Sequence, residues 1–407
     1  MEGKDTARKA QELSPIIIDI RRNLHRNPEL SYQEHKTAAF IASHLRDMGI
    51  EVKESVGGTG VVGLLRGNKE GRTIAVRADM DALPVNEAND LLYRSIYDNC
   101  MHACGHDGHM AIILGVAKLL APIRDSFVGN IKFIFQPAEE IPPEGGAKRM
   151  IAEGVLLDPP VDAILGVHIW PDVLSGEVAL KAGPIMAEAD KFELFIRGKG
   201  GHGASPHHTV DTFVITAQVI LALQTLVSRK IDPLKSVVLS IGKCNGGSAY
   251  NIIPDEVRLE GTTRYFEAKL GNFMKEQIEK LVNGICQAYG GFYELNYQYG
   301  FPPTVNDYQI TSLVAQSASE ILGKEKVHWI EAPSMTGEDF SFYLQQVPGC
   351  YFWLGTKNPD KGIVNPLHSS SFQLDEEVLS LGTAILTQTI LNFLNNKQYH
   401  IGVKIES

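Results

Sequence analysis

The sequence contains little cysteine and no long uninterrupted apolar run. Its five cysteines are odd in number and scattered, at positions 100, 104, 244, 286 and 350. This spacing argues against a disulfide framework and fits a reducing cytosol. The longest apolar runs, such as 111–120, are interrupted and too short to cross a bilayer, and residues 1–25 lack an apolar core of signal-peptide length. We therefore expect a cytoplasmic protein with no membrane partner.

Positive charge is also scarce. The formal net charge is −10, from 38 Lys and Arg against 48 Asp and Glu. Nucleic-acid-binding proteins normally carry a basic face, so this balance argues against a nucleic-acid partner but leaves small anionic substrates open. The chain lacks the Gly-x-Ser-x-Gly motif of serine hydrolases, and the glycine-rich segment 198–203 lacks the Lys-Ser/Thr end of a P-loop.

Most of the chain has an α/β pattern. Helical periodicity covers 16–24, 37–48 and 108–121, and short apolar runs predict buried strands at 60–65, 73–78, 131–135 and 163–167. Strands that alternate with helices predict a mostly parallel sheet flanked by helices on both faces. Residues 300–407 return to this character, with helices at 307–322 and 376–394 and a strand at 351–354.

The middle of the chain has a different pattern. Between residues 187 and 299, predicted strands and helices follow the order β-α-β-β-α-β, which is that of a ferredoxin-like unit. We therefore predict a first domain made of residues 1–186 and 300–407, with a separate domain of residues 187–299 inserted into it.

The segment Met101–His109 concentrates metal-binding side chains. Within nine positions it contains three histidines, one cysteine and one aspartate. Cys and His are good ligands of zinc and other late divalent metals, and two glycines let the backbone turn so that nearby side chains converge. We interpret Cys104 and His106 as the core of a metal site, in preference to a chance cluster of capping and core residues. A chain of 407 residues can bury a large core without a metal, so the site is expected to be functional.

The pair Glu139-Glu140 follows the predicted strand 131–135. A hydrolytic metal site needs one carboxylate on the metal and another that takes a proton from water. An isolated Glu pair also fits a solvated loop, but its place after a buried strand strengthens the metal interpretation. Asp79–Asp81 and His168 also come directly after predicted strands. Ligands collect at the carboxyl ends of such strands, so we predict one shared site.

Some of these residues carry weak signals when taken alone. His168 also fits a structural histidine at a strand end, and His368 fits an ordinary loop residue. Asp79 and Asp81 fit either turn capping or orientation of a ligating histidine. In the inserted segment, four glycines surround His202, which favours a flexible turn that presents its imidazole.

Asn251 and Arg264 flank the predicted strand 256–264 of the insert. Arginine is suited to bidentate binding of a carboxylate, and it is equally typical of a surface ion pair. The residues alone do not separate these two roles.

In their combined order, five motifs resemble the zinc-peptidase family of aminoacylases and carboxypeptidases. The similarity covers essentially the whole chain and is greatest to the subgroup of hippurate hydrolases, auxin-conjugate hydrolases and thermostable carboxypeptidases. The motifs are Asp79-Met80-Asp81-Ala82-Leu83-Pro84, His102-Ala103-Cys104-Gly105-His106-Asp107, Gln136-Pro137-Ala138-Glu139-Glu140, Gly201-His202-Gly203-Ala204 and Gly337-Glu338-Asp339-Phe340.

This resemblance implies a two-metal catalytic domain with an inserted dimerisation or lid domain. It implies that the chain forms a homodimer or a dimer-based homotetramer. Glu139 would be the general base, Asp81 would steer a ligand, and His202 would enter the partner subunit's site to stabilise the oxyanion. Asn251 and Arg264 would hold the substrate carboxylate. The implied metal ligands are Cys104, His106, Glu140, His168 and His368.

This sequence departs from the pattern of the wider family at one place. Wider relatives have a ligating histidine where Asp79 stands and a bridging aspartate in the region of Cys104, so the ligand field differs here. We expect two divalent ions, zinc first and manganese, cobalt or nickel as alternatives, that activate water for attack on an amide beside a free carboxylate. The substrate would be an N-acyl amino acid or a peptide. The rival hypothesis is a non-catalytic metal-binding scaffold or sensor, which would not need Glu139, His202 or Arg264.

Overall fold

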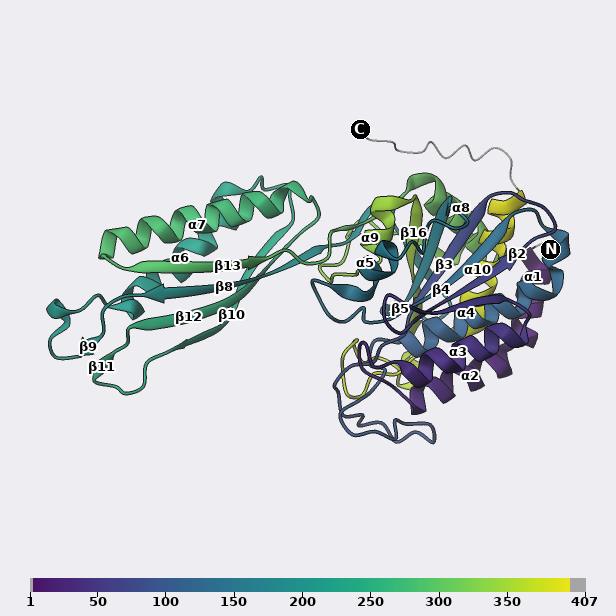
Figure 1. Cartoon of the computed structure of the whole chain (residues 1–407), viewed down its shortest axis with the longest axis horizontal. Coiled ribbons are helices and arrows are strands. Elements are labelled where there is room, and N and C mark those ends of the chain that lie inside the picture. Colours follow the sequence, from purple (N-terminus) through teal and green to yellow (C-terminus); the bar gives the residue numbers. More distant parts are fainter. Residues whose placement is uncertain (1–2, 396–407) are drawn as a thin grey trace. The chain divides into compact units, whose positions relative to one another are not determined.

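A computed structural model describes residues 3–395 and divides the chain into two compact units (Figure 1). The first unit comprises Met1–Ile185, Thr304–Pro333 and Asp339–Ser407, and the second comprises Met186–Pro303 and Ser334–Glu338. The second unit thus takes a short segment, 334–338, from the region that we assigned to the first domain. The predicted domain segments also include residues 1–2 and 396–407, which lie outside the described residues.

The first unit is built on an eight-stranded sheet with the order β1-β2-β4-β3-β5-β16-β6-β15. The pairs β4–β3, β3–β5 and β5–β16 at its centre are parallel, and the antiparallel pairs lie toward its edges. Its strands are β1 (Glu51–Val56), β2 (Gly60–Arg66), β3 (Thr73–Asp79), β4 (Asn130–Gln136), β5 (Ala163–Leu174), β6 (Val178–Leu180), β15 (Val327–Trp329) and β16 (Gly349–Lys357), with β7 (Gly183–Met186) and β14 (Thr304–Asn306) paired beside it.

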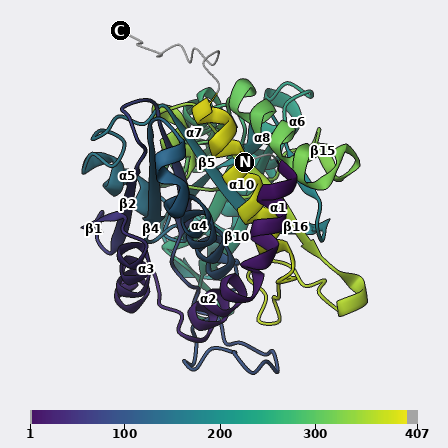
Figure 2. The same ribbon diagram turned by 90° about the vertical axis from the view of Figure 1, so that its right-hand side faces the viewer.

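Helices cover both faces of this sheet, so the predicted α/β class with a mostly parallel sheet is confirmed. On one face α1, α4 and α10 lie side by side (Figure 2), and on the other Phe340, which directly precedes α9, stacks on Tyr351 of β16. The helices are α1 (Gly3–Glu12), α2 (Ser14–Arg26), α3 (His35–Asp47), α4 (His106–Leu120), α5 (Gly145–Ala152), α8 (Tyr308–Leu322), α9 (Ser341–Gln346) and α10 (Val378–Asn395).

The second unit is a four-stranded antiparallel sheet with two helices on one face. The strand order is β10-β12-β8-β13, and the chain order β-α-β-β-α-β is the predicted ferredoxin-like order. Alternate residues of β8, namely Phe192, Leu194 and Ile196, are buried in the core shared with the helices. The elements are β8 (Glu188–Arg197), α6 (Thr212–Lys230), β10 (Val237–Gly246), β12 (Glu256–Tyr265), α7 (Lys269–Tyr289) and β13 (Phe292–Gln298), with a small ribbon of β9 (Gly201–His202) and β11 (Ile252–Ile253).

Within residues 3–395, two helices, α6 and α10, are long and apolar enough to cross a membrane by length and composition. Most of α10 is buried in the core of the first unit, which accounts for its composition. In contrast, α6 buries one face on its own sheet and exposes Phe213, Val214 and Leu221 on another.

Candidate metal centre

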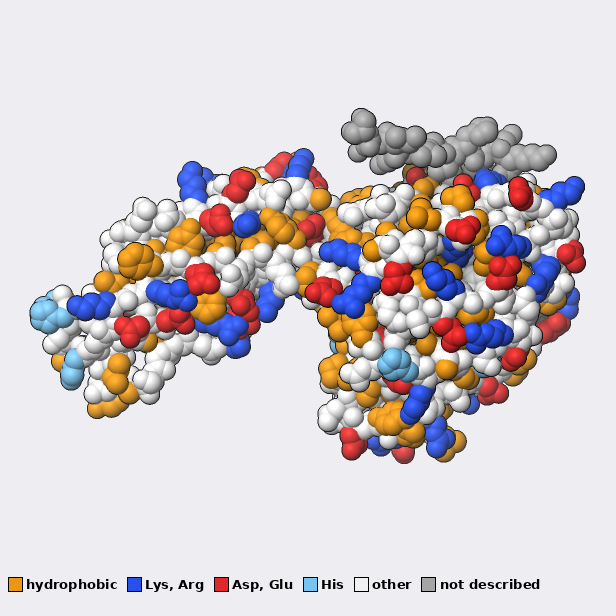
Figure 3. Space-filling view, viewed as in Figure 1, with side chains coloured by type: hydrophobic (Ala, Val, Ile, Leu, Met, Phe, Trp, Pro, Cys, Tyr) orange, Lys and Arg blue, Asp and Glu red, His pale blue; other side chains and the backbone are white. Residues whose placement is uncertain are grey.

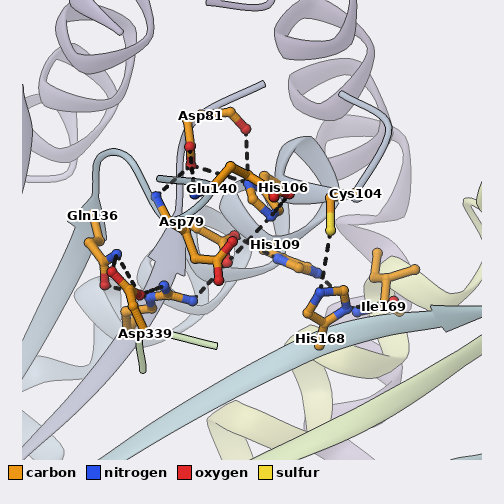
Figure 4. Close-up of polar contacts among 12 residues, drawn as sticks. Asp79, Asp81, Cys104, His106, His109, Gln136, Glu140, His168, Ile169 and Asp339 are labelled. Carbon is orange, nitrogen blue, oxygen red and sulfur yellow. Dashed lines mark hydrogen bonds and ion pairs between the residues drawn. The ribbon is translucent and has the colours of Figure 1, made fainter. Parts of the chain in front are cut away.

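The polar cluster of the first unit lies at the carboxyl ends of the parallel strands (Figure 4). Asp79 is the last residue of β3, and Glu139 and Glu140 follow β4. His168 lies on β5, just beyond Gly166, the last residue of β5 that pairs with β3. We predicted that the strand ends before His168. This was wrong, because β16 continues beside β5 and extends it to Leu174.

A tight turn brings Cys104 and His106 to the cluster. Gly105 between them has φ +87°, in the left-handed region that glycine adopts without strain, and α4 begins at His106. The Cys104 thiol lies 3.6 Å from Nε2 of His168. All three side chains are buried. The turn therefore gathers ligands that are separated along the chain.

Hydrogen bonds orient both buried histidines the same way. Nδ1 of His106 lies 2.8 Å from the backbone oxygen of Asp81, and Nδ1 of His168 lies 2.7 Å from the backbone oxygen of Ile169. A carbonyl accepts only from N–H, so Nδ1 carries the proton in the neutral form of each ring, and Nε2 is the nitrogen that offers a lone pair in that form. Both rings thus present Nε2 to the cluster, which is what a metal ligand requires.

Asp81 organises the two glutamates. Its Oδ1 accepts from the backbone N–H of Glu139 at 3.1 Å, and its Oδ2 accepts from that of Glu140 at 3.0 Å. Glu34 accepts from the N–H of Ala138 at 2.9 Å, and Ala138 has φ +53°. These bonds hold an unfavourable left-handed turn that places Glu139 and Glu140 at the site.

His368 reaches the cluster from an irregular loop. Its φ is +62°, its N–H donates to the backbone oxygen of Ala103 at 2.8 Å, and its Nε2 lies 3.2 Å from Oε1 of Glu140. Asn89 supports the same loop, because its amide donates to the backbone oxygen of Phe372 at 3.0 Å. The fifth candidate ligand is therefore held by loop-to-loop hydrogen bonds.

The donor atoms form overlapping groups that fit divalent ions. Cys104, His106 and His168 offer ligand atoms within 4.8 Å of one another, and so do Cys104, Glu140 and His368. The two groups share Cys104. Among the described residues, the buried Nε2 of His106 has no hydrogen-bond partner. A buried polar atom without a partner is costly, and a metal ion would satisfy it.

The electrostatics of the cluster also favour a cation. Burial lowers the pKa of His106, but the charges of Asp79, Asp81 and Glu140 outweigh it and raise the pKa to about 10. Burial, followed by the charges of Glu140, Glu139 and Asp79, raises the pKa of the Cys104 thiol well above its usual value. The site is thus strongly negative, and bound cations would offset this charge.

The other predicted residues belong to the second unit. His202 on β9 pairs with Ile252 of β11, and the N–H of Gly203 donates to the backbone oxygen of Asn251, so His202 and Asn251 lie close together. Nδ1 of His202 accepts from the N–H of Ala204 at 3.0 Å, which leaves Nε2–H as the donor of a neutral ring. Histidine side chains gather at this end of the unit (Figure 3).

Arg264 lies far from that pair within the same unit. It is the ninth residue of β12, whereas Asn251 precedes the strand's first residue, Glu256. At about 3.3 Å per residue the strand alone separates Glu256 from Arg264 by roughly 26 Å. Arg264 is half-buried, and across residues 3–395 no carboxylate forms an ion pair with it. The structure therefore does not bring Asn251 and Arg264 of one chain together.

Arg77 and His109 both contact Asp79, and neither residue was predicted from the sequence to belong to the site. Arg77 is a charged residue that follows the apolar run Ile74–Val76 inside the buried strand β3, and it is fully buried. A buried charge needs a partner, so its presence directly after an apolar run was the available signal.

Comparisons with known proteins agree with this geometry. The model of the peptidase family M20/M25/M40 matches residues 75–392. Thermostable carboxypeptidase 2 of Saccharolobus solfataricus is 44% identical over 387 residues, which cover 95% of this chain and 97% of the relative. The N-acetyl-L-cysteine deacetylase of Bacillus subtilis is 40% identical over 405 residues, 97% of this chain and 94% of the relative.

A solved structure extends the similarity to the fold. The YXEP protein of Bacillus subtilis, described as a dinuclear metal-binding peptidase from the M20 family, superimposes with a TM-score of 0.81. It is 35% identical, and the match covers 94% of this chain and 99% of that one. This chain therefore belongs to the peptidase family M20/M25/M40 and is a metal-dependent hydrolase that acts on C–N bonds.

Proposed function

We propose that the chain hydrolyses the amide bond of N-acyl amino acids or peptides beside a free carboxylate. The observation that carries this proposal is the overlap of two ligand groups at Cys104, with Glu139 beside them. The names of the relatives support both substrate classes. One is a carboxypeptidase, and another, 43% identical over 306 residues, is the N-acyl-L-amino acid amidohydrolase of Geobacillus stearothermophilus.

Five residues would hold two divalent ions, namely Cys104, His106, Glu140, His168 and His368. Zinc is the first candidate because the donors are a thiolate and imidazoles, and manganese, cobalt and nickel are alternatives. When bound, the ions supply Lewis acidity and lower the pKa of water.

The chain's own residues would perform the proton transfers. Glu139, whose backbone is fixed by Asp81, accepts a proton from the attacking water and returns it to the leaving amine. His202 donates its Nε2–H to the carbonyl oxygen, where negative charge develops. Arg264, which has no ion-pair partner among the described residues, binds the substrate carboxylate together with Asn251.

We further propose a cytoplasmic homodimer, or a tetramer built from such dimers. The exposed apolar side chains of α6, Phe213, Val214 and Leu221, form a face that a second copy would cover. In the dimer, His202 of one chain would complete the site of its partner.

The test compares kcat/KM of metal-reconstituted protein for N-acetyl amino acids, N-benzoyl amino acids and dipeptides. We expect hydrolysis of at least one class, and Glu139→Gln should lower kcat by about 10²–10⁴-fold while both metals stay bound. Asp158→Asn, outside the site, is the control. A Glu139→Gln protein with near-full activity would remove Glu139 from its role, and no hydrolysis by metal-loaded protein would refute the function.

A further inference from the structure

Asp79 lies at the centre of a buried chain of contacts that the proposed mechanism does not use (Figure 4). Its Oδ2 accepts from Nη1 of Arg77 at 2.7 Å, and its Oδ1 lies 2.7 Å from Nδ1 of His109. All three side chains are fully buried. Arg77 is itself fixed, because Nη2 pairs with Asp339 at 2.7 Å and Nε donates to Gln136 at 2.9 Å.

The hydrogen bonds assign the proton positions of His109. Its Nε2 accepts from the backbone N–H of Ile169 at 2.9 Å, so in the neutral ring Nδ1 carries the proton and donates to Asp79. Both ring nitrogens are therefore occupied by protein groups. Although Asp79, His106 and His109 lie close enough to hold an ion, His109 has no free lone pair for one.

The carboxylate of Asp79 is also fully engaged by protein groups. Each of its oxygens already has a partner, one of them the buried Arg77 cation. If Asp79 turned to a metal, the buried Arg77 cation would lose the Asp79 carboxylate and keep only its contacts with Asp339 and Gln136 among those described above, which is unfavourable in the protein interior. Asp79 is thus suited to orient other groups.

The chain of contacts ends at a metal ligand. His109 fixes the N–H of Ile169, and the backbone oxygen of the same residue accepts from Nδ1 of His168. The ring centroids of His109 and His168 are 4.7 Å apart in an edge-to-face arrangement. Ile169 is therefore held on both sides, and this sets the direction in which His168 presents Nε2.

We propose that Asp79 and His109 are positioning residues that orient the ligand His168, and that Asp79 does not bind the metal. This inference rests on the proposed metal centre. It does not depend on which substrate is cleaved.

The experiment measures Co²⁺ binding by chelator competition in Asp79→Asn, His109→Leu and the double variant. We expect each single variant to bind Co²⁺ about 10–100-fold more weakly, and the double variant to be little worse than either single one, because both act through one line of contacts. His109→Gln, which keeps an acceptor for Ile169, should retain most of the affinity. His44→Leu, on the surface helix α3, is the matched control.

A second measurement distinguishes a changed orientation of His168 from general disruption of the metal site. In the Co²⁺ spectrum of His109→Leu, the thiolate-to-metal band of Cys104 should persist while the ligand-field bands shift. Wild-type Co²⁺ affinity in His109→Leu combined with a large loss in Asp79→Asn would make Asp79 a ligand and overturn the proposal. Wild-type affinity in both variants would overturn it as well. Hydrolysis is scored separately, so tight Co²⁺ binding without hydrolysis would refute the proposed function alone.

Discussion

At the scale of single residues, buried charges determine how the ligands of the candidate metal centre are protonated. Cys104 must lose its proton to bind a metal, yet burial and the neighbouring carboxylates raise the pKa of its thiol. The same carboxylates raise the pKa of His106 to about 10. Metal binding must therefore displace protons from both side chains, so metal affinity should increase as the pH rises.

The thiolate of Cys104 should also decide which metal is preferred. Replacing it by a harder carboxylate in Cys104→Asp should weaken binding of Zn²⁺ and shift the preference toward Mn²⁺, by about tenfold or more in relative affinity. The measurement is the metal content after dialysis against an equimolar mixture of the two ions. Cys350→Ala, at a buried cysteine outside the cluster, is the control. An unchanged metal ratio in Cys104→Asp would show that the thiolate does not set the preference.

The sequence identified which side chains gather at the centre but not how they are held. Cys104, His106 and the glutamate pair were visible because several unusual residues occur together. The left-handed conformations of Ala138 and His368 were not visible, since they depend on tertiary hydrogen bonds that their backbone N–H groups donate to Glu34 and to Ala103, respectively. Local propensity disfavours such conformations for residues other than glycine.

At the scale of elements, long periodic segments were predicted well and short ones were missed. The β-α-β-β-α-β order of the second unit follows from alternating burial, as in β8. In contrast, β6, β7, β14 and β15 have three or four residues each. Pairing with neighbouring chain segments defines them, and no local periodicity can develop over that length.

The start of β8 contains a buried acidic pair. Glu188 and Asp190 are both buried, and Asp190 accepts from the Tyr297 hydroxyl at 2.6 Å and from the N–H of Gly300 at 2.9 Å. Burial first, and then the charge of Asp190, raises the pKa of Glu188 to about 7, although a hydrogen bond with Tyr265 lowers it. This glutamate therefore binds a proton more tightly in the folded state.

This shift predicts how stability depends on pH. Between the usual glutamate pKa and about 7, the folded chain holds a proton that the unfolded chain has released, so the free energy of unfolding falls as the pH rises through this window. Glu188→Gln removes that loss and should stabilise the second unit at pH 8.5 by on the order of 2 kcal/mol, with little change at pH 4.5. Melting curves at both pH values measure the difference. Glu276→Gln, at an exposed glutamate of α7, is the control, and an equal effect of Glu188→Gln at both pH values would contradict the assignment.

At the scale of the whole molecule, the second unit separates residues that the proposed function needs together. His202 lies on the β9–β11 ribbon and Asn251 directly precedes β11, whereas Arg264 lies near the opposite end of β12. Sequence motifs indicate membership of a site, but they carry no information on which copy of the chain supplies each member. The length of β12 allows an experiment to show which copy supplies each residue. The two ends of this strand are too far apart for one chain to place both Asn251 and Arg264 against one small substrate.

We therefore expect Asn251 and Arg264 of any one site to come from different chains. Asn251→Ala and Arg264→Ala should each raise KM strongly as homodimers. A hybrid dimer of the two variants, purified with two affinity tags, contains one site with both residues intact, so it should regain about half of the original activity. A hybrid of Arg264→Ala with Arg264→Ala/Asn251→Ala has no intact site and should stay impaired, which controls for the tagging and assembly steps. If one chain supplied both residues, each site of the first hybrid would lack one of them, and its activity would match that of the homodimeric variants.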